Sequence, residues 1–427
     1  MSHYKPYPAY KDSGIEWIGE VPEHWKVVSL LHLFNIKAGG DLKKDFYSEE
    51  KTEEYSYPIY TNSIKSNEAY GFTSKPFFKA NTITVTGRGE IGYAIYRDHE
   101  YDAIIRLLVL TPKNNKPCKY FAYCINSILV FFGGNTAVSQ LSTEQISPYK
   151  IFCPPFPEQQ SIVSFLDRQT ARIDALITKK TRFIELLKEK RQALITHAVT
   201  KGLDPNVKMK DSGVEWIGEV PEKWEAVKIS HIGKLTKANG GSKQDNVDSG
   251  ISCIRYGDLY TTHEYIIRKS RSYIEEGKLD EYTAIQYGDA LFAASGETFE
   301  DIGRSAVNLL KEDACCGGDV IVLKPSKDID PLFLGYALDS IPSKYQKALM
   351  GRGYTVVHIY TEQLRDLIVA VPPSFEQKTI GIALDRQTAR IDLIIEKTQR
   401  SIDLLRERRS ALITAAVTGQ IDLRETI

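Results

Sequence analysis

LDRQTARID, at Leu166–Asp174 and again at Leu384–Asp392, is the stretch that decides the fold. The same spacing of 218 residues relates Thr143-Glu-Gln to Thr361-Glu-Gln, and it also relates Ala193-Leu-Ile-Thr to Ala411-Leu-Ile-Thr. A second repeat lies upstream of each copy: KDSGIEWIGEVPEHW begins at Lys11, and KDSGVEWIGEVPEKW begins at Lys210. Each half of the chain therefore has a repeated head, a middle of its own and a repeated tail.

The repeated tails are predicted to be long helices. Residues 167–200 contain no Pro or Gly and are rich in helix-forming residues, and Gly202 and Gly419 lie where a helix is expected to end. Apolar residues recur at alternating spacings of four and three, which is typical of a coiled coil. The predicted seam residues are Ile173, Ile177, Ile184, Leu187, Leu194, Ile391, Ile395, Ile402, Leu405 and Leu412.

Two such helices in one chain most simply pack against each other, as an antiparallel coiled coil. A helix of about 40 residues spans roughly 60 Å, so the pair would act as a ruler between the two middles. The alternative is a coiled coil between two whole chains. The predicted fold is α+β, with two mixed α/β domains separated by two long helices and related by a pseudo-twofold repeat.

Length and composition limit the class of protein. The chain has 427 residues, of which 42% are apolar and 26% charged, and its formal net charge is zero. These values exclude collagen-like, disordered and disulfide-framework classes. The six cysteines form no CxxC pair, and no run approaches 18 apolar residues. We therefore expect a cytoplasmic protein with reduced cysteines, no membrane segment and no metal site.

The two middles, residues 26–142 and 225–360, have little sequence in common. Short apolar runs such as Thr82–Thr86, Ile104–Leu110 and Asp319–Leu323 predict strands, with Gly, Asn and Ser between them. Polar and basic residues at the turns are of the kinds that read base edges in DNA. The candidate DNA-binding residues are Asn62, Ser63, Lys65, Arg88, Arg97, Asn135, Thr136, Lys243, Arg255, Tyr256, Ser295, Arg304, Arg352, Tyr354 and His358.

Two motifs suggest enzyme chemistry, but neither has the context it needs. Gly87-Arg-Gly-Glu-Ile-Gly92 matches GxGxxG, yet the alternating residues that follow predict a strand instead of a helix. Cys153-Pro-Pro-Phe156 approaches the motif of amino-methyltransferases, but a thiol is a poor acceptor for the target amino group, and Val371 stands at the equivalent position of the second repeat. We therefore interpret both as structural.

The order of these segments resembles the specificity (S) subunit of type I restriction–modification systems, over essentially the whole chain. The signals are Val-Pro-Glu-x-Trp ending at Trp25 and Trp224, and Pro-Pro-x-x-Glu-Gln at residues 154–159 and 372–377. The duplicated LDRQTARID helix and the Ala-Val-Thr ending at residues 198–200 and 416–418 complete the pattern. Ile251–Asp258 and Gly288-Asp289 also look like the family's second domain.

The resemblance implies that each middle is a target-recognition domain that reads one half of an asymmetric bipartite site in double-stranded DNA. The helices would set the spacer and dock two modification subunits, which bind S-adenosylmethionine and methylate adenine at N6. Motor–nuclease subunits would join for restriction and phage defence. This chain would then be non-catalytic, with no cofactor of its own.

The expected domains are residues 1–157 (head and first recognition domain), 158–203 (first helix), 204–375 (second head and recognition domain) and 376–427 (second helix and tail). From the residues alone, two other classes stay open. One is a self-contained DNA methyltransferase or nuclease, and the other is a scaffold that spaces two ligand-binding modules without binding DNA.

Overall fold

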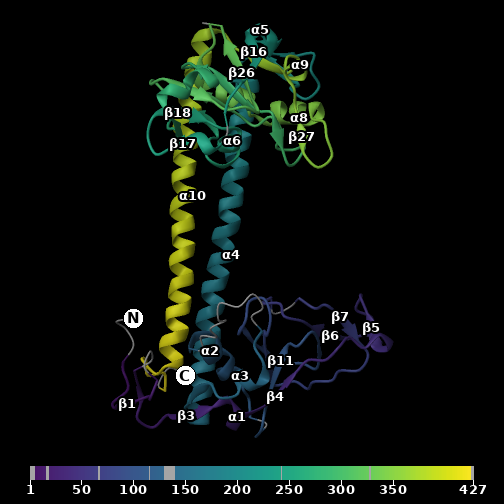
Figure 1. Cartoon of the computed structure of the whole chain (residues 1–427), viewed down its shortest axis with the longest axis vertical. Helices are drawn as coiled ribbons and strands as arrows, with labels where there is room; N and C mark the ends of the chain where they lie inside the picture. Colours follow the sequence, from purple (N-terminus) through teal and green to yellow (C-terminus); the bar gives the residue numbers. More distant parts are fainter. Residues whose placement is uncertain are drawn as a thin grey trace. The chain divides into compact units, whose positions relative to one another are not determined.

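The computed structural model describes residues 5–15, 19–65, 68–114, 116–128, 140–241, 243–326 and 328–424. The chain forms two compact units (Figure 1). Unit 1 comprises Met1–Lys180 and Arg400–Ile427, and unit 2 comprises Thr181–Gln399. Each unit thus contains one of the two middles, labelled recognition domains after the resemblance, together with one end of each long helix.

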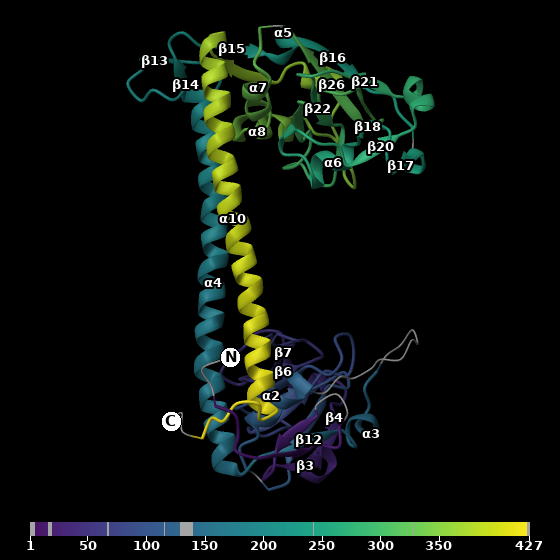
Figure 2. The ribbon, with the colours of Figure 1, turned by 90° about the vertical axis from the view of Figure 1, so that its left-hand side faces the viewer.

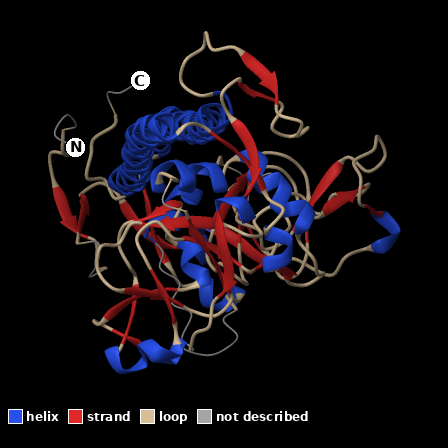
Figure 3. Ribbon diagram, turned by 90° about the horizontal axis from the view of Figure 1, so that it is seen from above, coloured by secondary structure: helices blue, strands red, loops and turns tan. Residues whose placement is uncertain are grey.

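The two tails are single long helices, α4 (Phe156–Lys201, 46 residues) and α10 (Ser374–Val417, 44 residues), seen along their length in Figure 2 and closer to end-on in Figure 3. Both end where the sequence predicts. Gly202 and Gly419 have φ of +78° and +73°, the left-handed conformation that ends a helix and that only glycine adopts without strain. Within the described residues, no helix is both long and apolar enough to cross a membrane.

The pairing of the helices is antiparallel. In unit 1, Asp174 of α4 and Arg409 of α10 form an ion pair of 2.9 Å, and in unit 2 Arg191 of α4 pairs with Asp392 of α10 at 3.1 Å. As the residue number rises along one helix it falls along the other, and the two pairs are equivalent under the 218-residue repeat. The predicted antiparallel coiled coil and pseudo-twofold repeat are confirmed.

The first recognition domain is built from two four-stranded sheets in unit 1. One is antiparallel, with the order β4-β11-β8-β9; the other, with the order β10-β6-β7-β5, contains one parallel pair, β10 and β6. The strands are β4 (Phe34–Ala38), β5 (Tyr47–Ser48), β6 (Tyr57–Tyr60), β7 (Gly71–Thr73), β8 (Thr82–Val85), β9 (Ala94–Arg97), β10 (Asp102–Ala103) and β11 (Leu108–Pro112).

The second recognition domain, in unit 2, repeats this topology with one strand added to each sheet. The orders are β16-β26-β22-β24-β19 and β17-β20-β18-β25-β21, and β18 and β25 again run parallel. The strands are β16 (Gly233–Lys237), β17 (Asn246–Val247), β18 (Ile251–Ile254), β19 (Tyr265–Ile267), β20 (Ser272–Ile274), β21 (Thr283–Ile285), β22 (Ala290–Ala293), β24 (Ser305–Asn308), β25 (Ala314–Cys316) and β26 (Val320–Pro325). Two middles with little sequence in common therefore share one fold.

Each head is a small hairpin followed by a buried tryptophan. The hairpins are β1 (Tyr10–Asp12) with β2 (Glu20–Pro22), and β13 (Met209–Asp211) with β14 (Glu219–Pro221), in the same register. The next strand in each half, β3 (Lys26–Ser29) or β15 (Glu225–Lys228), pairs with the strand that precedes the long helix, β12 (Lys150–Cys153) or β28 (Ile368–Val371). This pairing joins the start of each recognition domain to its end.

The remaining elements are short. They are α1 (Leu30–Leu33), η1 (Lys44–Phe46), α2 (Lys119–Ile128), α3 (Thr143–Ile146), α5 (Ile229–Ile232), η2 (Lys243–Asp245), α6 (Tyr256–Thr261), η3 (Glu276–Glu281), β23 (Ser295–Gly296), α7 (Pro331–Leu338), α8 (Ile341–Met350), β27 (Val357–His358) and α9 (Thr361–Leu364).

The tail after α10 returns to the first head, within unit 1. The Asp422 amide donates to the Lys5 carbonyl at 2.8 Å, and the Tyr10 hydroxyl donates to the Gly419 carbonyl at 3.0 Å. A Cβ at Gly419 would meet Pro22 and Trp25, as one at Gly202 would meet Pro221 and Trp224. The tail therefore lies against the first head as the link after α4 lies against the second.

Candidate nucleic-acid interface

Asn62 joins three loops of the first recognition domain. Its side-chain oxygen accepts hydrogen bonds from the amides of Gly87 at 2.7 Å and Arg88 at 3.3 Å, and its side-chain nitrogen donates to the Ile105 carbonyl at 2.8 Å. These loops follow β6, β8 and β10. The structure thus brings the predicted residues Asn62 and Arg88 together, with Asn62 acting as a positioning residue for the backbone around it.

The turn at Ile105–Arg106, which the sequence did not single out, lies in this cluster. The run 104–110 was predicted to be one strand, and that prediction is wrong at its start because the backbone turns before β11. Ile105 and Arg106 both have positive φ, 54° and 61°. Ile105 is 45% exposed, and Arg106 is exposed beside it.

The other predicted residues of this domain have different surroundings. Arg88 is exposed and donates to the Gln140 side chain at 3.2 Å, whereas Ser63 and Lys65 both bind Glu68. Arg97 is only 2% exposed; it lies 3.5 Å over the Tyr60 ring, and burial lowers the pKa of its guanidinium. In this conformation Arg97 supports the sheet. Asn135 and Thr136 lie outside the described residues.

In the second domain, the predicted residues Lys243, Arg255 and Tyr256 line one cavity of about 660 Å³. Arg255 is only 8% exposed, and its guanidinium makes two hydrogen bonds to the Asn246 side-chain oxygen, at 2.9 and 2.6 Å. Lys243 and Tyr256 are exposed. The arrangement leaves Lys243 and Tyr256 accessible to a ligand and makes Arg255 a support for the cavity wall.

A second group forms around the pair of strands β23 and β27. The Ser295 hydroxyl and His358 Nδ1 lie 3.0 Å apart, and the backbone of Arg352 pairs with that of His358. The Tyr260 hydroxyl of α6 donates to the Ser295 carbonyl, and Arg304 donates to the Tyr260 carbonyl. Tyr354, in the loop before β27, is fully exposed. Five predicted residues thus lie on β23, on β27, in the loop before β27 or directly before β24: Ser295, Arg304, Arg352, Tyr354 and His358.

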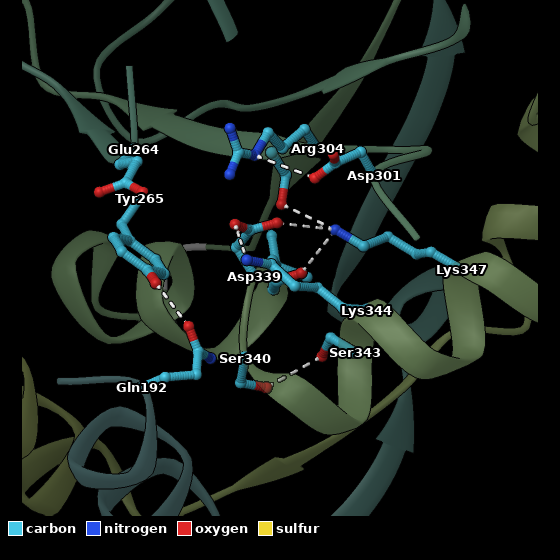
Figure 4. A network of polar contacts seen from close by, with 12 residues as sticks. Gln192, Glu264, Tyr265, Asp301, Arg304, Asp339, Ser340, Ser343, Lys344 and Lys347 are labelled. Carbon is cyan, nitrogen blue, oxygen red and sulfur yellow. Dashed lines mark hydrogen bonds and ion pairs between the residues drawn. The ribbon is translucent and has the colours of Figure 1, made fainter. Parts of the chain in front are cut away.

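A buried lysine holds the segment that leads into Arg304 (Figure 4). Lys347 of α8 has no exposed surface; its ammonium donates to the Gly303 carbonyl at 2.7 Å and to Asp339 at 3.0 Å. Lys344 reaches the other oxygen of Asp339 at 3.2 Å. Burial lowers the pKa of Lys347, and the Asp339 carboxylate opposes that shift. The network fixes the segment that carries Arg304.

The duplicated LDRQTARID helix makes the same contact in both units. The first aspartate of the motif accepts a tyrosine hydroxyl and a cation from the neighbouring recognition domain. Asp167 takes Tyr123 and Lys119, both at 2.7 Å. Asp385 takes Tyr336, at 3.3 Å, and Arg268. The same motif therefore holds two domains of different sequence against the long helices.

The predicted seam residues form one face of the helices. Ile173, Ile184, Leu187, Ile391, Ile402 and Leu412 are buried, and Ile177, Leu194, Ile395 and Leu405 are half-buried. Two positions of the seam are occupied by arginines, Arg191 and Arg409, and these form the interhelical ion pairs.

A family model described as the type I restriction modification DNA specificity domain matches residues 22–186 and 221–402, which is most of the chain and one match per repeat. The chain belongs to the specificity subunits of type I restriction–modification systems. The sequence-based recognition is confirmed.

Two relatives match this specificity subunit over nearly all of its length. The putative type I restriction enzyme MjaX specificity subunit of Methanocaldococcus jannaschii is 22% identical over 95% of this chain and 96% of that protein. The MjaVIII specificity subunit of the same organism is 23% identical over 95% and 94%. A putative specificity subunit of Mycoplasma pneumoniae, S.MpnORF507P, is 29% identical, but over only 39% of this chain and 46% of its own length.

Solved structures share the fold of this specificity subunit. One, from work on complex assembly and conformational transition of the type I R-M system, has a TM-score of 0.71 at 13% identity and covers 94% of this chain and 99% of that one. The HsdS subunit of Thermoanaerobacter tengcongensis has a TM-score of 0.50, also at 13% identity, over 94% and 98%. At this identity the likeness shows the fold alone.

The motifs that mark the specificity subunit now have structural explanations. The glutamate of Pro-Pro-x-x-Glu-Gln accepts the indole N–H of the head tryptophan: Trp25 donates to Glu158 and Trp224 to Glu376, both at 3.0 Å. The glutamine donates to the carbonyl of the motif's first proline, at 2.9 Å in the first copy and 2.8 Å in the second. These residues tie each head to the start of a long helix, and Cys153-Pro-Pro-Phe156 is the strand end that leads into α4.

Proposed function

We propose that this specificity subunit reads an asymmetric bipartite site in double-stranded DNA, with one half-site for each recognition domain. The observation that carries the proposal is the contrast within the repeat. Two domains have one topology and are latched to the helices by the same motif, yet different residues occupy their loops. Asn62, Arg88 and the Ile105–Arg106 turn present one surface, and the cavity with Lys243 and Tyr256 presents another. Because base contacts determine the sequence that is read, two domains of one fold with different surface residues should read different half-sites.

We also propose that α4 and α10 set the number of unread base pairs between the half-sites. Their lengths, 46 and 44 residues, correspond to roughly 70 Å at 1.5 Å per residue. The seam is regular and is apolar apart from Lys180, Thr398 and the arginines of the ion pairs, so the helix pair is suited to be a stiff spacer.

The repeated surface of the helices supports docking of two copies of one partner. Arg172 and Arg390 are equivalent under the repeat and exposed, and neither has a hydrogen bond or ion pair with the residues that the structure describes. Internal packing therefore does not account for their repetition. We propose that each binds a modification subunit that carries S-adenosylmethionine and methylates adenine at N6, with motor–nuclease subunits joining for restriction. The specificity subunit itself would contribute no catalytic residue and bind no cofactor.

The test is a map of N6-methyladenine across host DNA, with and without this gene. The expected result is a two-part asymmetric motif that disappears when the gene is removed. An unchanged map in a host with active modification subunits would refute the proposal. A short undivided motif would mean that only one recognition domain reads DNA. Methyl transfer by the isolated chain would instead indicate a self-contained enzyme.

A further inference from the structure

The turn between β10 and β11 has a backbone conformation that its residues disfavour. Ile105 and Arg106 are consecutive and both left-handed, with φ of 54° and 61°. For a β-branched residue such as isoleucine this conformation is a true outlier. Strain of this kind persists only where the surroundings enforce it, and it concentrates at functional sites.

Hydrogen bonds from two neighbouring loops hold the turn in this conformation. The Ile105 amide donates to the Gly40 carbonyl at 3.1 Å, and the Ile105 carbonyl accepts from the Asn62 side chain at 2.8 Å. The Leu107 carbonyl accepts from the Gly39 amide at 2.7 Å, and a Cβ at Gly39 would lie 2.5 Å from the Ala103 carbonyl oxygen. Glycine is therefore needed beside the turn, to let the neighbouring loop approach it.

The side chains of the turn are turned outward. Ile105 is 45% exposed, although it is an aliphatic residue in a domain with a well-formed core. Arg106 is exposed, and its guanidinium has no hydrogen bond or ion pair with any residue in the described part of the chain. The Arg106 guanidinium is therefore not tied to any described residue, and Ile105 keeps 45% of its surface open to solvent beside it.

The second domain shows that the fold does not require these residues. There the parallel pair β18 and β25 replaces β6 and β10, and the equivalent turn before β26 is formed by Gly317, Gly318 and Asp319. Of these three residues only Asp319 has a positive φ, 54°, so the fold does not require two consecutive left-handed residues at this place. The turn Gly317–Asp319 lines the same cavity as Lys243 and Tyr256, so in both domains this turn is part of the candidate interface.

We propose that the Ile105–Arg106 turn is the element of the first recognition domain that enters a groove of the DNA and determines part of its half-site. Arg106 supplies a guanidinium that can bind guanine through two parallel hydrogen bonds, and Ile105 supplies an apolar surface suited to a thymine methyl group. Asn62 is the positioning residue that holds the turn. This inference rests on the proposed function, because it needs the first domain to read DNA.

The test uses R106G in the assembled complex with modification subunits. The rate of methyl transfer is measured on duplexes that carry each single base change in either half-site. In the variant, discrimination at one or two positions of the first half-site is expected to fall by about 5- to 100-fold, with the second half-site unchanged. Because glycine adopts positive φ freely, the Tm of the variant should stay level or rise by up to about 4 °C.

The change in base discrimination separates reading from structure, because the Tm is expected to stay level or rise in either case. A purely structural turn would gain stability in R106G with no change in the motif, and that result would overturn the inference. Equal weakening at every base of both half-sites would overturn it too, since it would indicate a phosphate contact. The matched control is K113G, which removes an exposed cation at the other end of β11 and should leave discrimination unchanged. If the wild-type complex shows no sequence preference at all, the proposed function fails, not this inference alone.

Discussion

Replacing Lys347 by methionine should destabilise unit 2 strongly. The ammonium is fully buried and donates to the Gly303 carbonyl at 2.7 Å, to the Leu338 carbonyl at 3.0 Å and to Asp339 at 3.0 Å. In K347M these acceptors lose their donor, and Asp339, only 1% exposed, keeps a single cation, Lys344. Removing one partner of a buried ion pair lowers the free energy of unfolding by about 3–5 kcal/mol.

The expected change in Tm follows from the size of the unit. Unit 2 spans Thr181–Gln399, and for a unit of this size each kcal/mol shifts Tm by about 2–4 °C. K347M should therefore lower the thermal transition of unit 2 by about 6–20 °C. Differential scanning calorimetry of the full chain measures the Tm, and unfolding in guanidinium measures the free energy of unfolding.

Lys344 provides the matched control because it binds the same carboxylate from a more exposed position. Its side chain is 27% exposed and lies 3.2 Å from Asp339, so K344M should lower the free energy of unfolding by about 1 kcal/mol or less. The double variant D339N/K347M should lose less than the sum of the two single variants, since it leaves no buried charge unpaired. If K347M and K344M are equally destabilised, or if K347M unfolds like the wild type, the reasoning from burial is wrong.

Three further outcomes are expected. Inserting one heptad at equivalent points of α4 and α10 adds about 10 Å and should lengthen the unread spacer by roughly 3 base pairs. If the methylation map shows an unchanged spacer, the helices do not set its length. E158A should lower Tm more than E376A, because Glu158 accepts from both Trp25 and Tyr7 while Glu376 accepts from Trp224; equal losses would contradict this. Burial lowers the pKa of His263, so the unfolded state binds more protons just below about pH 6.5 and stability should fall as pH falls through that range. H263Q should lose less Tm than the wild type between about pH 7.5 and pH 5, and parallel losses would show that other groups dominate.

The helices could be predicted from the sequence because their signals are local. A run without Pro or Gly, a spacing of four and three, and Gly202 and Gly419 at the ends are all visible in single segments. The common topology of the two middles could not be predicted. The equivalent strands β8 and β22 are buried throughout, so neither shows an alternation of polar and apolar residues. Their equivalence lies in the strands beside them and not in their own residues.

The candidate interface was only partly predictable for a similar reason. Asn62 and Arg88 stand in turn-forming sequence and were identified, whereas Ile105–Arg106 lies in an apolar run that predicts a strand. Arg97 and Arg255 have the residue type of a DNA contact, but the Tyr60 ring and the Asn246 side chain occupy their guanidinium groups. The sequence identifies a cationic side chain, but only the three-dimensional contacts show whether another residue of the protein already binds it.

The return of the tail to the first head repeats, in unit 1, the contact that the link after α4 makes with the second head in unit 2. Gly419 lies against Pro22 and Trp25 as Gly202 lies against Pro221 and Trp224, so the two halves of the chain share this contact as well. A shorter chain with one head, one middle and one helix would still carry both partners of the interhelical ion pair, since Asp174 and Arg191 of α4 are equivalent to Asp392 and Arg409 of α10. Under the proposed function, a homodimer of such chains would read a palindrome, and fusing two genes for such chains would be the step that freed the half-sites to diverge.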